Sequence, residues 1–173
     1  MYYPELAAVG ASVRFPLGPY LNHAEFAYYA SLDDPRGADP LIANSQIRGF
    51  VGTEKSLGHE WTVGAQYYAE WMLDYDLYRT GIPAGFPVFN ELRSTVTLRV
   101  EKLAAHQNLH LSAFGFWGIT DQDYHLRPAI SYKITDAVGW TVGASVVGGN
   151  KPYTTFGQFR HNSNVFTRLR YSF

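Results

Sequence analysis

The sequence predicts an all-β protein built around one antiparallel up-and-down sheet. Apolar and polar side chains alternate in about nine stretches, the pattern of strands whose successive side chains point in opposite directions. Gly-, Asn- or Asp-bearing turns separate several of these stretches, and apolar residues at helical spacing are nearly absent. With 173 residues, of which 46% are hydrophobic, the chain fits a single domain over 1–173.

Each expected strand shows this two-residue period. The longest run, WTVGAQYYAEWMLDYDL, places Trp61 and Leu77 on one face and Glu70 on the other. The run ELRSTVTLRVEKLAAHQ also has apolar residues three or four apart, as in a helix, but its β-branched residues favour a strand. The expected strands cover 7–15, 23–32, 47–54, 61–77, 92–101, 109–120, 125–134, 140–146 and 165–173.

The connections differ in length in a regular way. The tight turns PLGPY, SLGHE, AAHQN and TDAVG alternate with other connections, most of which are long, such as DDPRGADPLIANS and GGNKPYTTFGQFRHN. In an antiparallel up-and-down sheet, successive connections lie at opposite ends of the strands. We therefore expect short turns at one end of the sheet and mostly long loops at the other.

Composition excludes several classes of protein. A net charge of -1 with 16% aromatic residues is unlike a disordered tail and gives no electrostatic reason to bind nucleic acid. The absence of cysteine, Cys 0, excludes disulfides and zinc-thiolate sites. No apolar run approaches the roughly 18–20 residues of a transmembrane helix, and MYYPELAAVG does not resemble a signal peptide. If the protein is exported, we expect its signal to precede this segment.

The alternation alone fits two architectures of opposite polarity. A soluble lipocalin-like barrel would hold its apolar face inside around an apolar ligand, whereas an outer-membrane barrel presents that face to lipid. Charges in mid-strand, rings near strand ends such as Trp61 and Trp140, strands of about ten residues, and the unequal connections favour the membrane. We expect a transmembrane antiparallel up-and-down β-barrel of about 8–10 strands. Its lumen would be lined by Arg14, Arg48, Glu70, Arg93, Arg99, Arg127, Lys133, Arg168 and Arg170.

The C-terminal strand carries a recognisable ending. Leu169, Tyr171 and Phe173 place an apolar residue and two rings at alternate positions up to the last residue. This ending resembles the terminal strand by which Gram-negative outer-membrane β-barrels are recognised by their assembly machinery. The resemblance, to the class of porin-like barrels, implies a location in the bacterial outer membrane, with the lipid bilayer and the assembly machinery as partners.

Strand parity raises a question about closure. If Phe173 lies on the periplasmic side, counting backward places the start of the first strand outside, whereas complete single-chain barrels have an even strand number and both ends inside. A strand missed within residues 1–7, a count wrong by one, or an incomplete barrel would each explain this. We favour the C-terminal part of a larger barrel, which would close through a partner chain or self-association.

The expected function is a passive pore for small polar or anionic solutes, because basic residues slightly outnumber acidic ones on the polar face. Alternatively, those charges pair across the lumen in a non-conducting structural or adhesion barrel. Asp121 and Asp123 are candidate Ca²⁺ ligands, against the simpler interpretation of a solvated loop. His161 and Ser163 invite a nucleophile–base interpretation, but no third orienting residue is identifiable. We expect no enzyme activity, no cofactor and no metal.

The terminal motif generates the first prediction. Phe173→Asp is expected to lower the yield of assembled protein in cells, because a charged terminal residue removes the aromatic part of the assembly signal. Heat-modifiable mobility of membrane fractions on gels measures this yield, and an unchanged yield would count against the assigned role.

Overall fold

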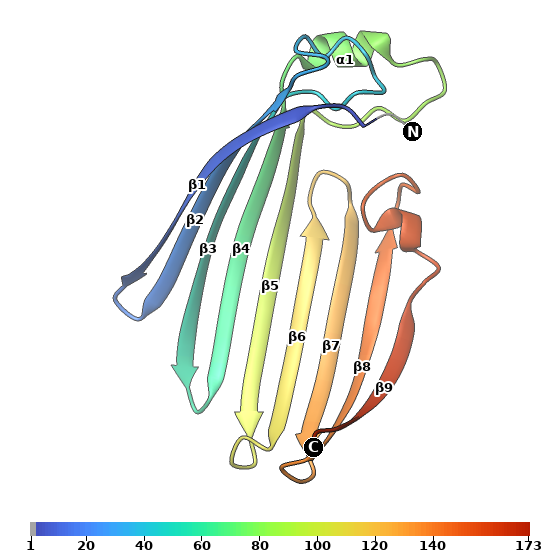
Figure 1. Cartoon of the computed structure of the whole chain (residues 1–173). Helices are drawn as coiled ribbons and strands as arrows, with labels where there is room; N and C mark the ends of the chain where they lie inside the picture. The colour runs from blue at the N-terminus through green and yellow to red at the C-terminus, as the bar shows by residue number, and fades with distance from the viewer. Residues whose placement is uncertain (1–2) are drawn as a thin grey trace.

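The computed structural model describes residues 3–173 and contains one antiparallel sheet. Its 9 strands pair strictly with their sequence neighbours, in the order β1 to β9 (Figure 1). The all-β class and the up-and-down order predicted from the alternation are therefore confirmed, and the strand number falls within the expected range. The strands are β1 Leu6–Leu17, β2 Tyr20–Ser31, β3 Gln46–Gly58, β4 Trp61–Met72, β5 Leu92–Ala104, β6 Leu109–Gly118, β7 Asp123–Lys133, β8 Val138–Gly149 and β9 Asn164–Tyr171.

The two ends of the sheet differ as expected. The turns after β1, β3, β5 and β7 lie together at the end where the chain finishes, which we call the turn end (Figure 1). At the turn between β3 and β4, His59 and Glu60 have φ of 47° and 63°, the left-handed pair of a type I′ hairpin. The longer connections and the start of β1 lie at the opposite end, which we call the loop end.

The expected strand over 61–77 is wrong in its last part. β4 stops at Met72, and the helix α1 covers Tyr75–Gly81. Leu73 donates its backbone N–H to the carbonyl of Ser45, and Asp74 then takes a left-handed φ of 54°, which breaks the extended course of the chain. Tyr78 is buried and its hydroxyl accepts the backbone N–H of Phe89, which anchors α1 over the loop end.

Within residues 3–173, no helix combines the length and the hydrophobicity needed to cross a membrane.

Other boundaries shift by a few residues. The ambiguous run at 92–101 is a strand, as predicted, and continues to Ala104. The last strand ends at Tyr171 rather than Phe173, although Ser172 still donates its N–H to the carbonyl of Ala137. Residues 1–2, part of the region in which a missed strand was considered, lie outside the described residues, and residues 3–5 form no strand.

One face of the sheet is apolar and exposed along its whole width. Val9 on β1 is 67% exposed, and Val165 on β9 is 78% exposed. Among the described residues only Tyr78 and Val147 are buried hydrophobic side chains, so the sheet encloses no apolar core of its own. Every strand contributes at least one large exposed apolar residue to this face, represented by Val9, Phe26, Val51, Tyr67, Leu98, Trp117, Leu126, Trp140 and Leu169.

The predicted closure into a barrel is not observed: the sheet is open. Within the described residues β1 pairs only with β2, and β9 only with β8. Both edge strands run from the loop end to the turn end (Figure 1). Each antiparallel pairing reverses the strand direction, so the first and ninth strands are parallel. An antiparallel ladder therefore cannot join the two edges directly. The odd number of strands therefore prevents direct closure, as the strand count from the sequence indicated.

Candidate functional site

A row of alternating charges crosses the polar face near the loop end. Arg48 on β3 lies opposite Glu70 on β4, and Glu70 lies opposite Arg93 on β5. Glu70 contacts both guanidinium groups, at 3.3 Å from Nε of Arg48 and 3.6 Å from Nη1 of Arg93. The shared face follows from the strand register, since directly opposed residues project to the same side. We call Arg48, Glu70, Arg93 and the adjoining Asp121 the charged row.

The charged row continues onto the loops. Arg93 donates from Nη2 to Oδ2 of Asp121, 2.8 Å away. Asp121 lies in the connection between β6 and β7 and is only 8% exposed. The same nitrogen donates to Oγ1 of Thr155, at 3.1 Å, in the long connection between β8 and β9. One arginine on the sheet thus ties two loop-end segments to the polar face.

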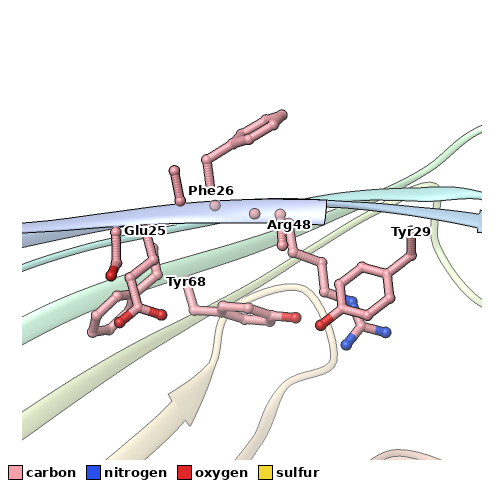
Figure 2. Close-up of a pocket in the computed structure, with 11 residues that line it drawn as sticks. Glu25, Phe26, Tyr29, Arg48 and Tyr68 are labelled. Carbon is pink, nitrogen blue, oxygen red and sulfur yellow. The ribbon is translucent and has the colours of Figure 1, made fainter. Parts of the chain in front are cut away.

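Neutral polar groups and rings support the charged row. The Tyr68 hydroxyl donates to Oε2 of Glu70 at 3.0 Å, and the Arg48 guanidinium lies 4.4 Å from the ring centroid of Tyr29. The division between the two faces is visible in Figure 2, where Glu25, Tyr29, Arg48 and Tyr68 point to one side of the sheet and Phe26 points to the other. The row is therefore held in place by hydrogen bonding and ring stacking as well as by charge.

A second ionic group lies nearer the turn end. Arg99 on β5 contacts Glu54 at 3.6 Å and Glu101 at 2.8 Å, and Glu101 lies 3.7 Å from Nε2 of His110. Gly64 separates Glu54 from Arg99 in the register, so the ion pair spans the strand between them. The polar face therefore carries two charge networks at different heights.

Aromatic side chains also lie on the polar face, where a soluble surface would have little reason to hold them. Phe116 packs edge-on against Phe114, with ring centroids 4.6 Å apart. Its ring also stacks on that of His125, with 6.1 Å between the two ring centroids. Phe156, from the connection between β8 and β9, joins this cluster at 5.4 Å from Phe116. That connection is therefore folded onto the polar face and includes the short 3-10 helix η1, Gly157–Phe159.

Asp123 fastens the folded connection. Its carboxylate accepts the backbone N–H of Phe156 at 2.7 Å, and the residue is 2% exposed. A side chain at Gly118 would collide with this carboxylate, so the close approach requires glycine there. Asp123 thus has a structural role at the base of the loop.

Two hollows flank the ring of Tyr68 on the polar face. One, of about 360 Å³, is lined by Glu70, Arg93, Asp121 and Phe156 among others. The other, of about 380 Å³, is lined by Glu25, Tyr29 and Arg48 and is drawn in Figure 2. Both combine charged groups with rings, an arrangement that can bind water and small polar solutes.

The residues predicted to line a lumen all lie on this polar face, but they do not form a single cluster. Arg48, Glu70 and Arg93 form the charged row, and Arg99 belongs to the second network. Nζ of Lys133 lies 2.6 Å from Oδ1 of Asp136 in the turn between β7 and β8. The hydrogen bond and the charge of Lys133 lower the pKa of the Asp136 carboxyl. The other predicted arginines form no ion pair within residues 3–173; they are Arg14, Arg127, Arg168 and Arg170.

The candidate calcium ligands and the candidate His–Ser pair make structural contacts instead. Asp121 and Asp123, considered as Ca²⁺ ligands, bind Arg93 and a backbone N–H, and no metal-holding group of three acidic, His or Cys residues occurs within residues 3–173. Ser163 bonds to the backbone of Val147, while His161 accepts from Arg160.

Sequence reasoning missed Thr155 and Phe156 as parts of the polar face. Both lie in the long connection between β8 and β9, which has no two-residue period. The aromatic and β-branched content of PYTTFGQF was the only signal that this loop packs against something.

Comparison with protein families, with curated proteins and with solved structures finds no match to this chain. The function must therefore be inferred from its own geometry.

The charged row generates the second prediction. Glu70→Gln is expected to lower the free energy of unfolding by about 1–3 kcal/mol, because it leaves Arg48 and Arg93 without their shared carboxylate. Urea unfolding in detergent, followed by tryptophan fluorescence, measures the change. Glu25→Gln is the matched control, since Glu25 lies on the same face without an ion pair within the described residues. Equal effects of the two substitutions would contradict the importance of the row.

Proposed function

We propose that the chain is part of a bacterial outer-membrane β-barrel whose apolar face meets lipid and whose polar face lines a passage for small polar or anionic solutes. Outer-membrane barrels place apolar residues outward and polar residues toward the lumen. The observed sheet divides its side chains in this way.

The observation that carries the proposal is the contrast in exposure between the two faces. Large apolar side chains on one face are open to the surroundings, such as Val51 and Phe26 at 54% each. On the other face the residues of the charged row are paired, and Glu70 retains only 16% of its side-chain exposure. A soluble monomer rarely exposes an apolar patch larger than a few hundred Å². Lipid is the solvent that suits such a surface.

The height of the apolar face supports a bilayer. Trp61 and Trp71 lie at the two ends of β4 and are both exposed. At about 3.3 Å per residue their Cα atoms are about 33 Å apart along the strand, which a tilt of about 40° reduces to about 25 Å. That is the height of the apolar band between the aromatic girdles of outer-membrane barrels.

The unpaired arginines support a preference for anions. Most carboxylates on the polar face already contact a cation, whereas Arg14, Arg127, Arg168 and Arg170 have no carboxylate partner within residues 3–173. Uncompensated positive charge along a passage raises the local concentration of anions.

The open edges require a partner in a membrane. An unpaired backbone N–H or C=O in hydrocarbon costs several kcal/mol, and β1 forms a 12-residue edge. Because β1 and β9 are parallel, antiparallel closure takes an odd number of further strands. We propose that these come from another part of a larger barrel or from a partner chain.

A non-conducting structural barrel is the second candidate. The connection between β8 and β9 is folded inward, with Phe156 against Phe116 and Thr155 bonded to Arg93. If this connection obstructs the passage, the paired charges serve stability alone. A lipocalin-like soluble barrel remains the alternative of opposite polarity, and it predicts a protein that stays in solution without detergent.

Conductance is the third prediction. The full chain reconstituted in a planar bilayer is expected to pass single-channel currents with a reversal potential that favours anions. The double variant Arg168→Gln, Arg170→Gln should shift that potential toward cations, because it removes two uncompensated charges from the polar face.

The double variant Arg36→Gln, Arg79→Gln is the charge-matched control, because both of its sites lie in loop-end segments outside the strands. It should shift the reversal potential less. No current from a folded sample would reject the pore and favour the structural barrel.

A further inference from the structure

Two lysines stand on the apolar face at the turn end, each against an aromatic ring. Nζ of Lys55 lies 4.7 Å from the ring centroid of Tyr20, and Nζ of Lys102 lies 4.8 Å from that of Trp61. Neither lysine forms an ion pair within residues 3–173. Two uncompensated charges thus border a surface that is otherwise apolar.

The strand register places these lysines within reach of one ligand. Lys55 on β3 pairs with Val63 on β4, which pairs with Val100 on β5, two residues before Lys102. With strands about 4.8 Å apart and about 3.3 Å per residue, the two Cα atoms are about 12 Å apart. Nζ of Lys55 lies over Tyr20 on β2, so its long stem must turn toward β4 for both ammonium groups to meet a single anion.

An apolar groove lies on the same face, farther from the turn end along the strands that carry Lys55 and Tyr20. It has a volume of about 550 Å³. Small residues at Ala24, Gly49 and Ala69 leave the space, while Phe26 and Tyr67 form its sides. The pairs Ala24–Val51 and Phe26–Gly49 continue the same β2–β3 ladder that contains Tyr20–Lys55, so groove and lysine are aligned.

The other tryptophan of β4, at the loop end of the apolar face, is paired with a carboxylate instead of an ammonium group. At the loop end, Trp71 donates from Nε1 to the carboxylate of Glu91 at 2.9 Å. Glu91 would repel an anionic headgroup beside Trp71, whereas Lys102 beside Trp61 would attract one.

We propose that Lys55 and Lys102 bind the phosphate of one anionic phospholipid, whose acyl chain lies in the groove around Gly49. The inference rests on the proposed function, because it requires that this face meets lipid. A monoanionic phosphate matches two ammonium groups better than a zwitterionic headgroup, whose own cation competes for the phosphate. The tyrosine and tryptophan rings hold the lysine stems at the depth of the headgroups.

The fourth prediction tests this site by native mass spectrometry of the full chain in detergent. Phosphatidylglycerol and phosphatidylcholine with identical acyl chains are the probes. One phosphatidylglycerol is expected to remain bound, about fivefold more than phosphatidylcholine. A large excess of inorganic phosphate is expected to leave the lipid in place, and displacement of the lipid by that excess would overturn the assignment to a lipid.

Three variants separate headgroup from acyl chain. Lys55→Gln with Lys102→Gln should abolish the preference for phosphatidylglycerol, whereas Lys133→Gln with Lys151→Gln, away from the apolar face, should leave it unchanged. Gly49→Leu should weaken the binding of both lipids, and the site tolerates it because a Cβ there has no neighbour within 4 Å. Heat-modifiable mobility on gels confirms that each variant is folded.

The proposed function and this site fail in different ways. A chain that inserts into vesicles but binds both lipids equally, or whose preference survives loss of Lys55 and Lys102, overturns the site alone. A chain that stays in solution without detergent and does not insert overturns the membrane assignment, and the lipid site with it.

Discussion

The continuous backbone ladder is the constraint on which the rest of the structure depends. With almost no buried apolar side chains among the described residues, the sheet is held by strand pairing, and within residues 3–173 each strand pairs only with its sequence neighbours. Register then decides everything else, because a slip of one residue exchanges the two faces. A slipped β4 would place Glu70 among the apolar rings and Trp71 among the arginines. The charged row and the apolar face are thus two consequences of one register.

The polar face adds rigidity where the ladder alone is weakest. Arg93 joins β5 to Asp121 and Thr155, so the connections at the loop end are fastened to the sheet. At the turn end such ties are replaced by tight hairpins. Within residues 3–173 the apolar face carries no comparable network of ion pairs. This contrast between the ion pairs of the polar face and the exposed side chains of the apolar face is the physical basis for the proposal that the apolar face meets lipid.

Local pattern predicts local features well and long-range contacts poorly. The shared face of Arg48, Glu70 and Arg93 was predictable, because side-chain direction follows directly from position along a strand. The end of β4 was not, because alternation persists through Leu77 while the contact of Leu73 with Ser45 decides the fold there. Arg93 meets partners 28 and 62 residues away, and no periodicity encodes such contacts. Sheet closure likewise depends on edges that a strand pattern does not describe.

Cysteine labelling tests most directly the proposal that the apolar face meets lipid. The natural chain contains no cysteine, Cys 0, so each introduced thiol reports alone. Single variants at Gln66 and Tyr68 should react with a charged, water-soluble thiol reagent in vesicles, and those at Tyr67 and Ala69 should not. Alternating protection along β4 is the result expected for a polar lumen and a lipid-facing exterior. Equal reaction at all four positions, or protection at Gln66 and Tyr68 instead, would contradict it.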